Sequence, residues 1–413
     1  MLQLKLDNTI FLGKFYPPRM LTTIKEDSRG VIGFSNHNFE MSIVRGLIEN
    51  DVNLQILTIP GVYSWPHNNK KIYTSPESFF IDAVPVKSAG FLNIAIINKI
   101  SMIFSALFNL LMAFRKFDSK EIQVITNAPN IVILYALKLS KFLSNKRIEV
   151  TTIIPDIPVM VTKMHGRAGI KGRLVRWIDN RTVKLYEECD RHVLLTEAMT
   201  DFFDKPIKYI VMEGLIDENK YNFQLKYTST PERVIILYTG SIHRQFGIMN
   251  LVDAFEKASL PQEVELWICG SGDASEELRK RADCNRSIKF WGLVDSEKAR
   301  EMQYKAAILV NPRTSEHEFT KYSFPSKTLE YLASGKPVVM NRLPGMPKEY
   351  FNYVITPKDE SIEQWANTLK KVVCMPSLER EKIGSSGRDF VLKHKNAKAQ
   401  MKRVVNFIID SQV

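Results

Sequence analysis

The chain has 413 residues, of which 45% are hydrophobic and 25% are charged. This length favours two domains that each bury a core, and the composition excludes a largely disordered chain and a small protein that depends on disulfides. The formal net charge of +12 suits a nucleic acid, an anionic lipid surface or an anionic substrate, and does not choose among them.

The positive charge lies mainly in the first half, because residues 1–210 contain 27 Lys and Arg against 19 Asp and Glu, a net charge of +8. The segment Met1–Gly13 lacks the basic start and the apolar core of a signal peptide, so we expect a protein that is not secreted. The cysteines have no paired spacing, which predicts neither a disulfide framework nor a zinc site and fits a reducing cytoplasm: Cys189, Cys269, Cys284 and Cys374.

In the first half, short apolar runs alternate with longer segments of helical periodicity, which predicts a Rossmann-like domain with a parallel sheet. We expect strands near residues 9–12, 54–59, 122–126, 150–154 and 192–196. We expect helices over residues 38–49, 93–116, 130–144, 171–188 and 197–204.

The second half shows the same alternation more regularly and predicts a second Rossmann-like domain, so the fold class is α/β. Its expected strands are 233–238, 264–269, 287–291, 307–311 and 337–340, and its expected helices are 247–258, 273–283, 295–305 and 325–334. The polar segment 216–232 indicates a link between domains, and apolar residues at helical spacing predict a closing amphipathic helix near the end. We therefore expect domains at 1–210 and 211–394, with residues 395–413 packing back on the first domain.

Two stretches of the first half leave alternatives open. Ile103–Phe114 is apolar but shorter than the roughly 20 residues that span a bilayer, so it predicts either a buried core helix or a helix that lies in a membrane interface. Lys163–Arg176 holds five Lys and Arg and no acid, which fits a solvated basic loop or a contact with lipid headgroups.

The turns that follow the strands of the second half carry unusual residues, and ligands of open α/β sheets bind at this edge. Gly240 and Ser241 follow the first strand, and Arg244 comes shortly after them. Glycine lets backbone amides approach a phosphate, with which Arg244 can pair. Gly270 follows the second strand without a full dinucleotide fingerprint, which argues against a nicotinamide cofactor. Arg313 ends a later strand and is either a surface arginine or a phosphate ligand.

The sequence FPSKTLEYLASG at residues 324–335 predicts a short helix with Pro325 at its first position and Gly335 after its end. Ser326 and Lys327 then lie in the first turn, where free amides and the helix dipole attract an anion. A lysine there indicates that a phosphate occupies the site. Glu330 lies one turn further on and either accepts hydrogen bonds from sugar hydroxyls or is an ordinary exposed residue.

These motifs together resemble the family 4 glycosyltransferases of GT-B fold. The resemblance rests on TNAPN at 126–130, LLTEAM at 194–199, LYTGSIHRQFG at 237–247, WICGSGD at 267–273, WGLV at 291–294 and FPSKTLEYLASGKPVV at 324–339. It implies two facing Rossmann-like domains, a nucleotide-sugar donor on the C-terminal domain, an acceptor on the N-terminal one, and retaining transfer. No metal and no permanently bound cofactor are expected, and no Asp-x-Asp motif occurs.

The chain departs from the family's pattern where charged residues are usual. The family usually has two glutamates separated by seven residues, and the second of them holds the nucleotide ribose. Glu330 fits this second position, but Tyr322 occupies the first. The usual Arg and Lys of the loop after the first strand fall on Ser241 and Phe246. We therefore expect the donor to be held without the family's usual charged residues. The expected donor-binding residues are Gly240, Ser241, Arg244, Gly270, Arg313, Tyr322, Ser323, Phe324, Pro325, Ser326, Lys327 and Glu330.

Breaking the sugar–phosphate bond builds negative charge on the diphosphate, so Ser326, Lys327, Arg244 and Arg313 are expected to stabilise it. Asp156 follows a strand near the position where relatives often carry a functional histidine, and it either acts on the acceptor or belongs to an ordinary turn. The nearby Glu316 and Glu318 fit a solvated loop.

The resemblance implies that the donor is a UDP-sugar, with a GDP-sugar as the second choice. It implies a lipid-linked or other saccharide acceptor and a role in the synthesis of polysaccharides such as capsule or O-antigen. It also implies a cytoplasmic protein at the inner face of the cell membrane, held there by its basic first half. A nucleotide-sugar 2-epimerase on the same fold is the alternative. A nucleic-acid-binding protein is disfavoured because residues 163–176 lack interleaved aromatic residues.

Overall fold

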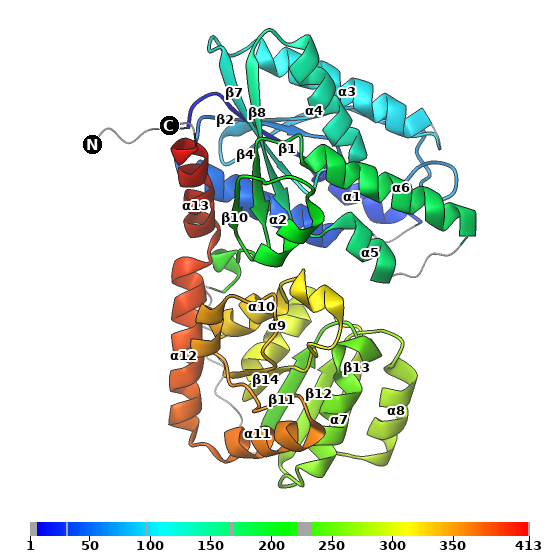
Figure 1. Ribbon diagram of the computed structural model, residues 1–413. Helices are drawn as coiled ribbons and strands as arrows, with labels where there is room; N and C mark the ends of the chain where they lie inside the picture. The colour runs from blue at the N-terminus through cyan, green and yellow to red at the C-terminus, as the bar shows by residue number, and fades with distance from the viewer. Residues whose placement is uncertain (1–5, 30–31, 96, 165–168, 222–232, 412–413) are drawn as a thin grey trace. The chain divides into compact units, whose positions relative to one another are not determined.

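The computed structural model describes residues 6–29, 32–95, 97–164, 169–221 and 233–411. Contacts divide the chain into two units, residues 1–215 with 397–413 (unit 1) and residues 216–396 (unit 2). Each unit has a mainly parallel sheet with helices around it (Figure 1). The predicted α/β class with Rossmann-like halves is therefore confirmed.

The sheet of unit 1 has the strand order β10-β9-β8-β7-β1-β2-β5-β4, and all neighbours are parallel except β4 and β5. The sequence did not predict the β4–β5 hairpin or the short pair β3–β6. The strands are β1 (Thr9–Gly13), β2 (Leu54–Thr58), β3 (Tyr73–Thr74), β4 (Glu77–Ile81), β5 (Val84–Ser88), β6 (Phe91–Leu92), β7 (Glu121–Asn127), β8 (Arg147–Ile154), β9 (Arg191–Leu194) and β10 (Tyr209–Val211).

Alternate side chains of the central strands enter two separate cores, because successive residues of a strand point to opposite faces of the sheet. Ile10 and Leu12 pack with α3 and α4, whereas Phe11 packs with α2 and α13. The helices are α1 (Pro18–Asp27), α2 (Phe34–Ile48), α3 (Ile97–Phe114), α4 (Ile131–Leu143), α5 (Pro158–Met164), α6 (Gly169–Tyr186) and α13 (Ala397–Asp410).

The last helix, α13, belongs to unit 1 although it follows unit 2 in the chain. Its residues Met401, Val404, Val405 and Ile408 are buried in the same core as α2. A Cβ at Gly46 would lie 2.5 Å from the carbonyl of Ala397, so this glycine permits the close approach of the two helices.

The contacts place the first boundary after Leu215, whereas the sequence placed it after residue 210. Two features hold the intervening segment on unit 1. β10 pairs with β9, and the amide of Gln400 in α13 donates to the carbonyl of Gly214 over 2.6 Å. The expected polar link at 216–232 begins with a 3-10 helix at Glu218–Lys220, and its residues 222–232 lie outside the described part of the chain.

Unit 2 has a five-stranded parallel sheet of order β13-β12-β11-β14-β15. Its strands follow the prediction to within two residues at either end, because each is a short run rich in apolar residues, and all but the edge strand β13 are mostly buried. They are β11 (Val234–Thr239), β12 (Val264–Cys269), β13 (Ile288–Gly292), β14 (Ile308–Asn311) and β15 (Val338–Met340). The helices are α7 (Ile248–Lys257), α8 (Ser275–Cys284), α9 (Ser296–Lys305), α10 (Lys327–Ala333), α11 (Ile362–Cys374) and α12 (Ser377–His394).

Several helices differ from their predictions. α2 begins four residues earlier and α3 four residues later than expected, and the sequence did not predict α1, α5, α11 and α12. The helix expected at 197–204 is a 3-10 helix at Glu197–Phe202, in which Phe203 donates to the carbonyl three residues back. The helix expected at 325–334 begins only at Lys327. Of the basic segment 163–176, residues 165–168 lie outside the described residues, and its remainder belongs to α5 and α6.

Candidate functional site

The candidate site of unit 2 lies at the carboxyl ends of its strands, where two glycine-containing loops touch. The amide of Gly240 donates to the carbonyl of Cys269 over 3.0 Å, and that of Ile242 donates to Ser271 over 2.8 Å. Gly270 has φ +141°, and a Cβ there would lie 1.8 Å from the carbonyl oxygen of Gly240. Only glycine fits this contact, so the turns after β11 and β12 form one packed edge that leaves Ser241 exposed.

Arg313 is held rigidly at the end of β14. Its guanidinium lies 4.8 Å from the ring centre of Phe246 and 5.1 Å from that of Phe319, and Nη1 is 3.4 Å from Oγ of Ser323. The side-chain amide of Asn341 donates to the Arg313 carbonyl over 2.9 Å. Phe246 stands where the resemblance leads one to expect a lysine. In this chain, it provides a ring surface for a cation that comes from another loop.

Arg244 does not join this cluster. Its backbone amide donates to Oδ1 of Asp273 over 2.9 Å, and its exposed guanidinium pairs with the carboxylate of Glu277 on α8. In the protein without a ligand, the charge of Arg244 is therefore paired with Glu277, and its contact with a phosphate stays a prediction. The sequence did not reveal the partner, because Glu277 lies 33 residues away.

The start of α10 differs from the sequence interpretation. Pro325 precedes the helix, and its carbonyl accepts from Thr328 over 2.8 Å in a tighter turn. Ser326 takes the N-cap position without a side-chain hydrogen bond. Nζ of Lys327 lies 2.7 Å from Oε2 of Glu330. In the protein without a ligand, the partner of Lys327 is therefore Glu330, and a contact of Lys327 with a phosphate stays a prediction.

The pair between Lys327 and Glu330 is half exposed, with 40% and 38% of the two side chains accessible. Such surface ion pairs contribute only about 0–1 kcal/mol to the stability of a protein. A diphosphate can therefore displace the carboxylate from Lys327 at small cost, which would leave the oxygens of Glu330 free to accept hydrogen bonds.

The remaining residues of the loop before α10 have different surroundings. The Tyr322 ring lies 5.2 Å from Nζ of Lys321 and is partly exposed, so a ring occupies the position of the family's first glutamate. Phe324 and Pro325 are buried, and the Phe324 ring packs 5.2 Å from that of Tyr350. Both therefore support the loop from below. The two acids expected in a solvated loop are both exposed: Glu316 and Glu318.

A buried tyrosine, which the sequence did not single out, joins α10 to the glycine turn. The Tyr331 hydroxyl accepts from the Thr239 amide over 2.8 Å and donates to the Thr239 carbonyl over 3.0 Å. Burial raises the pKa of Tyr331, so the hydroxyl stays protonated and serves both contacts. β14 pairs with β11 only as far as Leu237, and the hydroxyl continues the hydrogen bonding where that strand has diverged.

In unit 1, the carboxyl edge of the sheet holds a buried charge network that the sequence also did not single out. Glu40 of α2 accepts from the Lys14 amide over 2.7 Å and from the side-chain amides of Asn36 and Asn127 over 3.0 and 3.2 Å. Nζ of Lys14 donates to the Ala128 carbonyl over 2.5 Å. The network therefore fixes the turns after β1 and β7.

Burial raises the pKa of Glu40 and lowers that of Lys14, and the attraction between the two opposes both shifts. Perturbed buried charges at a strand edge are typical of functional sites. Asp156 lies at the same edge, exposed, in the turn between β8 and α5. Among the described residues, no group of three or more His, Cys, Asp or Glu is placed to hold a metal ion.

Comparison with known proteins assigns this architecture. Residues 233–375 match the family model described as "Glycosyl transferases group 1", while no curated protein sequence matches the chain. Sucrose-phosphate synthase from Thermosynechococcus elongatus superposes with a TM-score of 0.61 at 15% identity, covering 98% of both chains. The Anabaena protein HepE in complex with UDP superposes with a TM-score of 0.61 at 12% identity, covering 98% of this chain and 100% of that one.

A lipopolysaccharide outer core galactosyltransferase, WaaB, superposes with a TM-score of 0.58 at 12% identity, covering 98% of this chain and 99% of that one. At these identities the likeness establishes the fold, and it confirms the GT-B architecture that the sequence predicted.

Proposed function

We propose that the chain is a glycosyltransferase, which moves a sugar from a nucleotide diphosphate, with retention, to a saccharide acceptor; the match of residues 233–375 to the group 1 model and the GT-B fold support this. The acceptor is lipid-linked or free, and the product belongs to a cell-surface polysaccharide. A UDP-sugar is the preferred donor. The HepE structure holds UDP, and a trehalose-6-phosphate synthase of the same fold holds UDP-2-fluoro-glucose, which supports uracil as the base.

The observation that carries this proposal is the pair of cations at the edge of unit 2. Arg313 lies against two neighbouring aromatic rings beside Ser323, and Lys327 is paired with the half-exposed carboxylate of Glu330. Both come after β14, which pairs in parallel with β11, the strand that leads into the Gly240 turn, where backbone can approach a phosphate closely. This set of groups suits a diphosphate better than an uncharged ligand.

The chemistry then follows from where charge develops. When the bond between the anomeric carbon and the phosphate oxygen breaks, the leaving diphosphate gains negative charge and the sugar gains positive charge. Arg313, already fixed before the donor arrives, stabilises the diphosphate without reorganisation. Lys327 exchanges Glu330 for a phosphate oxygen, and Glu330 turns to the ribose hydroxyls.

In unit 1, we assign Asp156 to the acceptor, either as the group that orients its hydroxyl or as a stabiliser of the cationic sugar. The buried pair of Lys14 and Glu40 holds the turn after β1 in place and acts only through that turn. The protein would work in the cytoplasm at the inner face of the cell membrane, where lipid-linked acceptors are found.

The test compares binding of UDP and of uridine to the Lys327→Ala variant by titration calorimetry. Loss of a charge-assisted hydrogen bond costs about 1.5–3 kcal/mol, so UDP should bind roughly 10- to 150-fold more weakly while uridine is unaffected. Lys298→Ala is the matched control, because Lys298 forms the same kind of pair with Glu301 at the start of α9, over 2.9 Å. Equal losses for UDP and uridine would refute the phosphate contact.

Incubation with UDP-sugar alone separates the transferase from an epimerase on the same fold. A transferase releases UDP slowly and leaves the configuration of the sugar unchanged, whereas conversion of the donor to its 2-epimer would contradict the proposal.

A further inference from the structure

Helix α3 of unit 1 is apolar on both of its faces, but only one face packs against the sheet. Met102, Ala106 and Leu110 are buried in the core, at most 6% exposed. On the opposite side, Ile100, Phe104 and Phe108 follow one another at intervals of four residues and are 55%, 64% and 61% exposed. A helix that is apolar all round is normally enclosed, so the open face of α3 requires a partner.

The neighbouring helix α4 extends this surface. The two helices lie side by side (Figure 1), and Nζ of Lys146, just beyond α4, bonds to the Phe117 carbonyl just beyond α3. Near the end of α4, Phe142 is 85% exposed and Leu143 is 57% exposed. We define the α3–α4 face by its large exposed side chains, which are Ile100, Phe104, Phe108, Met112, Phe142 and Leu143.

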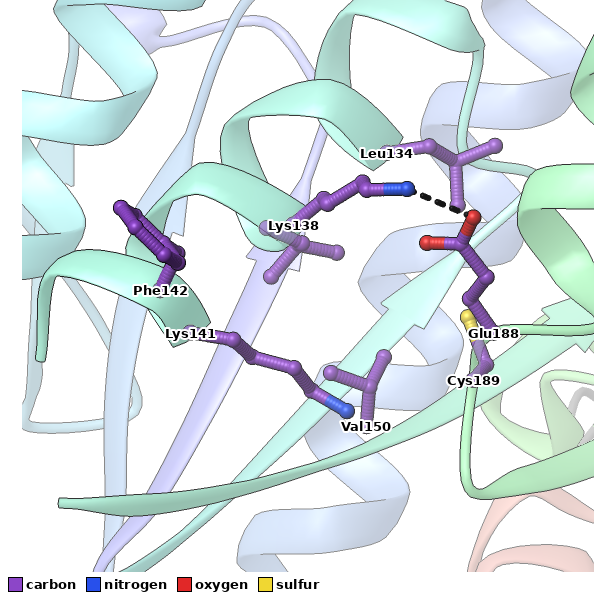
Figure 2. A pocket seen from close by; sticks show the side chains of 8 residues that line it. Leu134, Lys138, Lys141, Phe142, Val150, Glu188 and Cys189 are labelled. Carbon is purple, nitrogen blue, oxygen red and sulfur yellow. Dashed lines mark hydrogen bonds and ion pairs between the residues drawn. The ribbon is translucent and has the colours of Figure 1, made fainter.

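A small cavity of about 310 Å³ lies beside this face, between α4, β8 and the turn after α6 (Figure 2). Two of its lining lysines form ion pairs, Lys138 with Glu188 over 2.8 Å and Lys141 with Asp190 over 2.7 Å. Figure 2 shows Phe142 standing apart from the other lining side chains. Its ring therefore belongs to the outer surface, and the cavity does not enclose it.

The charges at the two ends of α3 are mainly positive, although the exposed Asp118 follows in the turn after the helix. α3 contains no acid, and Lys99 near its start and Arg115 and Lys116 after its end are exposed. Within the described parts of the chain, none of these three cations has an acidic partner. An apolar stripe with cations at both ends is the pattern of a helix that lies in the boundary between headgroups and acyl chains of an anionic bilayer.

α3 is 18 residues long with a mean hydropathy of 1.6, which by length and composition alone would permit a membrane span, and 33% of it is buried in the protein. Because Met102, Ala106 and Leu110 are fixed in the core of unit 1, the helix meets a bilayer only from its open side. We propose that the α3–α4 face docks on an anionic lipid surface, with the phenylalanine rings inserted among the acyl chains and Arg115 and Lys116 at the headgroups. This contact is apolar in its centre and does not depend on the identity of the acceptor.

The experiment measures co-flotation of the full chain with phosphatidylcholine vesicles that contain or lack phosphatidylglycerol. The wild type should float with the anionic vesicles, and the double variant Phe104→Ser/Phe108→Ser should bind at least tenfold more weakly. Arg115→Gln/Lys116→Gln should reduce binding to the anionic vesicles only. Leu293→Ser/Leu378→Ser is the matched control, because it removes equally exposed leucines, at 80% and 77%, from unit 2 and should float like the wild type.

Donor hydrolysis in the absence of lipid shows that each variant is folded. Flotation of Phe104→Ser/Phe108→Ser equal to that of the wild type would overturn the proposal. A second result would also overturn it: the wild type does not bind vesicles but sediments as a dimer, and Phe104→Ser/Phe108→Ser sediments as a monomer. The α3–α4 face would then be an interface between two copies of the chain. Either result leaves the proposed donor chemistry intact, since UDP binding is measured separately.

Discussion

Replacing Tyr331 by phenylalanine tests whether α10 and the glycine turn of unit 2 act as one piece. The side chain is fully buried, and the substitution removes one oxygen atom without changing the ring. That oxygen serves both the amide and the carbonyl of Thr239, the residue immediately before Gly240. The Thr239 hydroxyl also accepts from the amide of Gln303 over 3.2 Å.

The expected loss follows from the two contacts at 2.8 and 3.0 Å. Each neutral hydrogen bond contributes about 0.5–1.5 kcal/mol net, and leaving a buried donor without a partner costs about 1–3 kcal/mol. We therefore expect Tyr331→Phe to lower the free energy of unfolding by about 1–3 kcal/mol. Since the freed end of β11 leads directly into Gly240 and Ser241, UDP should also bind more weakly.

Urea unfolding and titration with UDP measure both effects. Tyr304→Phe is the matched control, because the buried Tyr304 hydroxyl has no hydrogen-bond partner among the residues described, and its removal should change neither quantity. A Tyr331→Phe protein with the stability and UDP affinity of the wild type would show that the hydroxyl bridge does not hold the turn.

Two further substitutions test the framework of each unit. Burial raises the pKa of Glu149, but hydrogen bonds from Gln123 and Arg191 outweigh it, so the pKa is lowered from 4.5. Glu149→Gln should therefore lower the free energy of unfolding by about 1.5–3 kcal/mol at neutral pH. In urea unfolding, the difference in stability between variant and wild type should shrink as the pH falls below 4.5, and a constant difference would contradict the paired charge. Gly270→Ala, which clashes with the Gly240 carbonyl, should abolish UDP binding. Gly292→Ala, which also has a positive φ, +66°, but open space around it, should keep it; equal affinities would refute the packed turns.

The strand and helix pattern of unit 2 could be predicted because it rests on local properties. Buried parallel strands are short apolar runs, and amphipathic helices repeat every 3.6 residues, so both are readable without knowledge of their neighbours. The site edge follows from the topology, which brings the carboxyl ends of all strands together. Gly240, Gly270 and Arg313 therefore lie at one edge, as expected.

Partners across loops could not be predicted in the same way. Arg244 meets Glu277 33 residues away, and Arg313 stacks on Phe246 from a different turn. Nothing in the sequence near Lys14 indicates that its backbone binds the carboxylate of Glu40. The pair of Lys327 and Glu330 was readable from their spacing of three residues, but the interpretation of the lysine as a phosphate ligand overlooked it.

Periodicity and turn residues act over a few positions, so the α/β class, the two Rossmann-like halves and the edge of the candidate site could be predicted from the amino-acid sequence alone. The apolar run at 103–114 was readable as a helix, but not which of its faces would be covered. Only the tertiary structure decided that Met102 and Leu110 enter the core while Phe104 and Phe108 remain open, since burial depends on where the sheet lies. It likewise decided that Arg313 is the cation held in place before a ligand arrives.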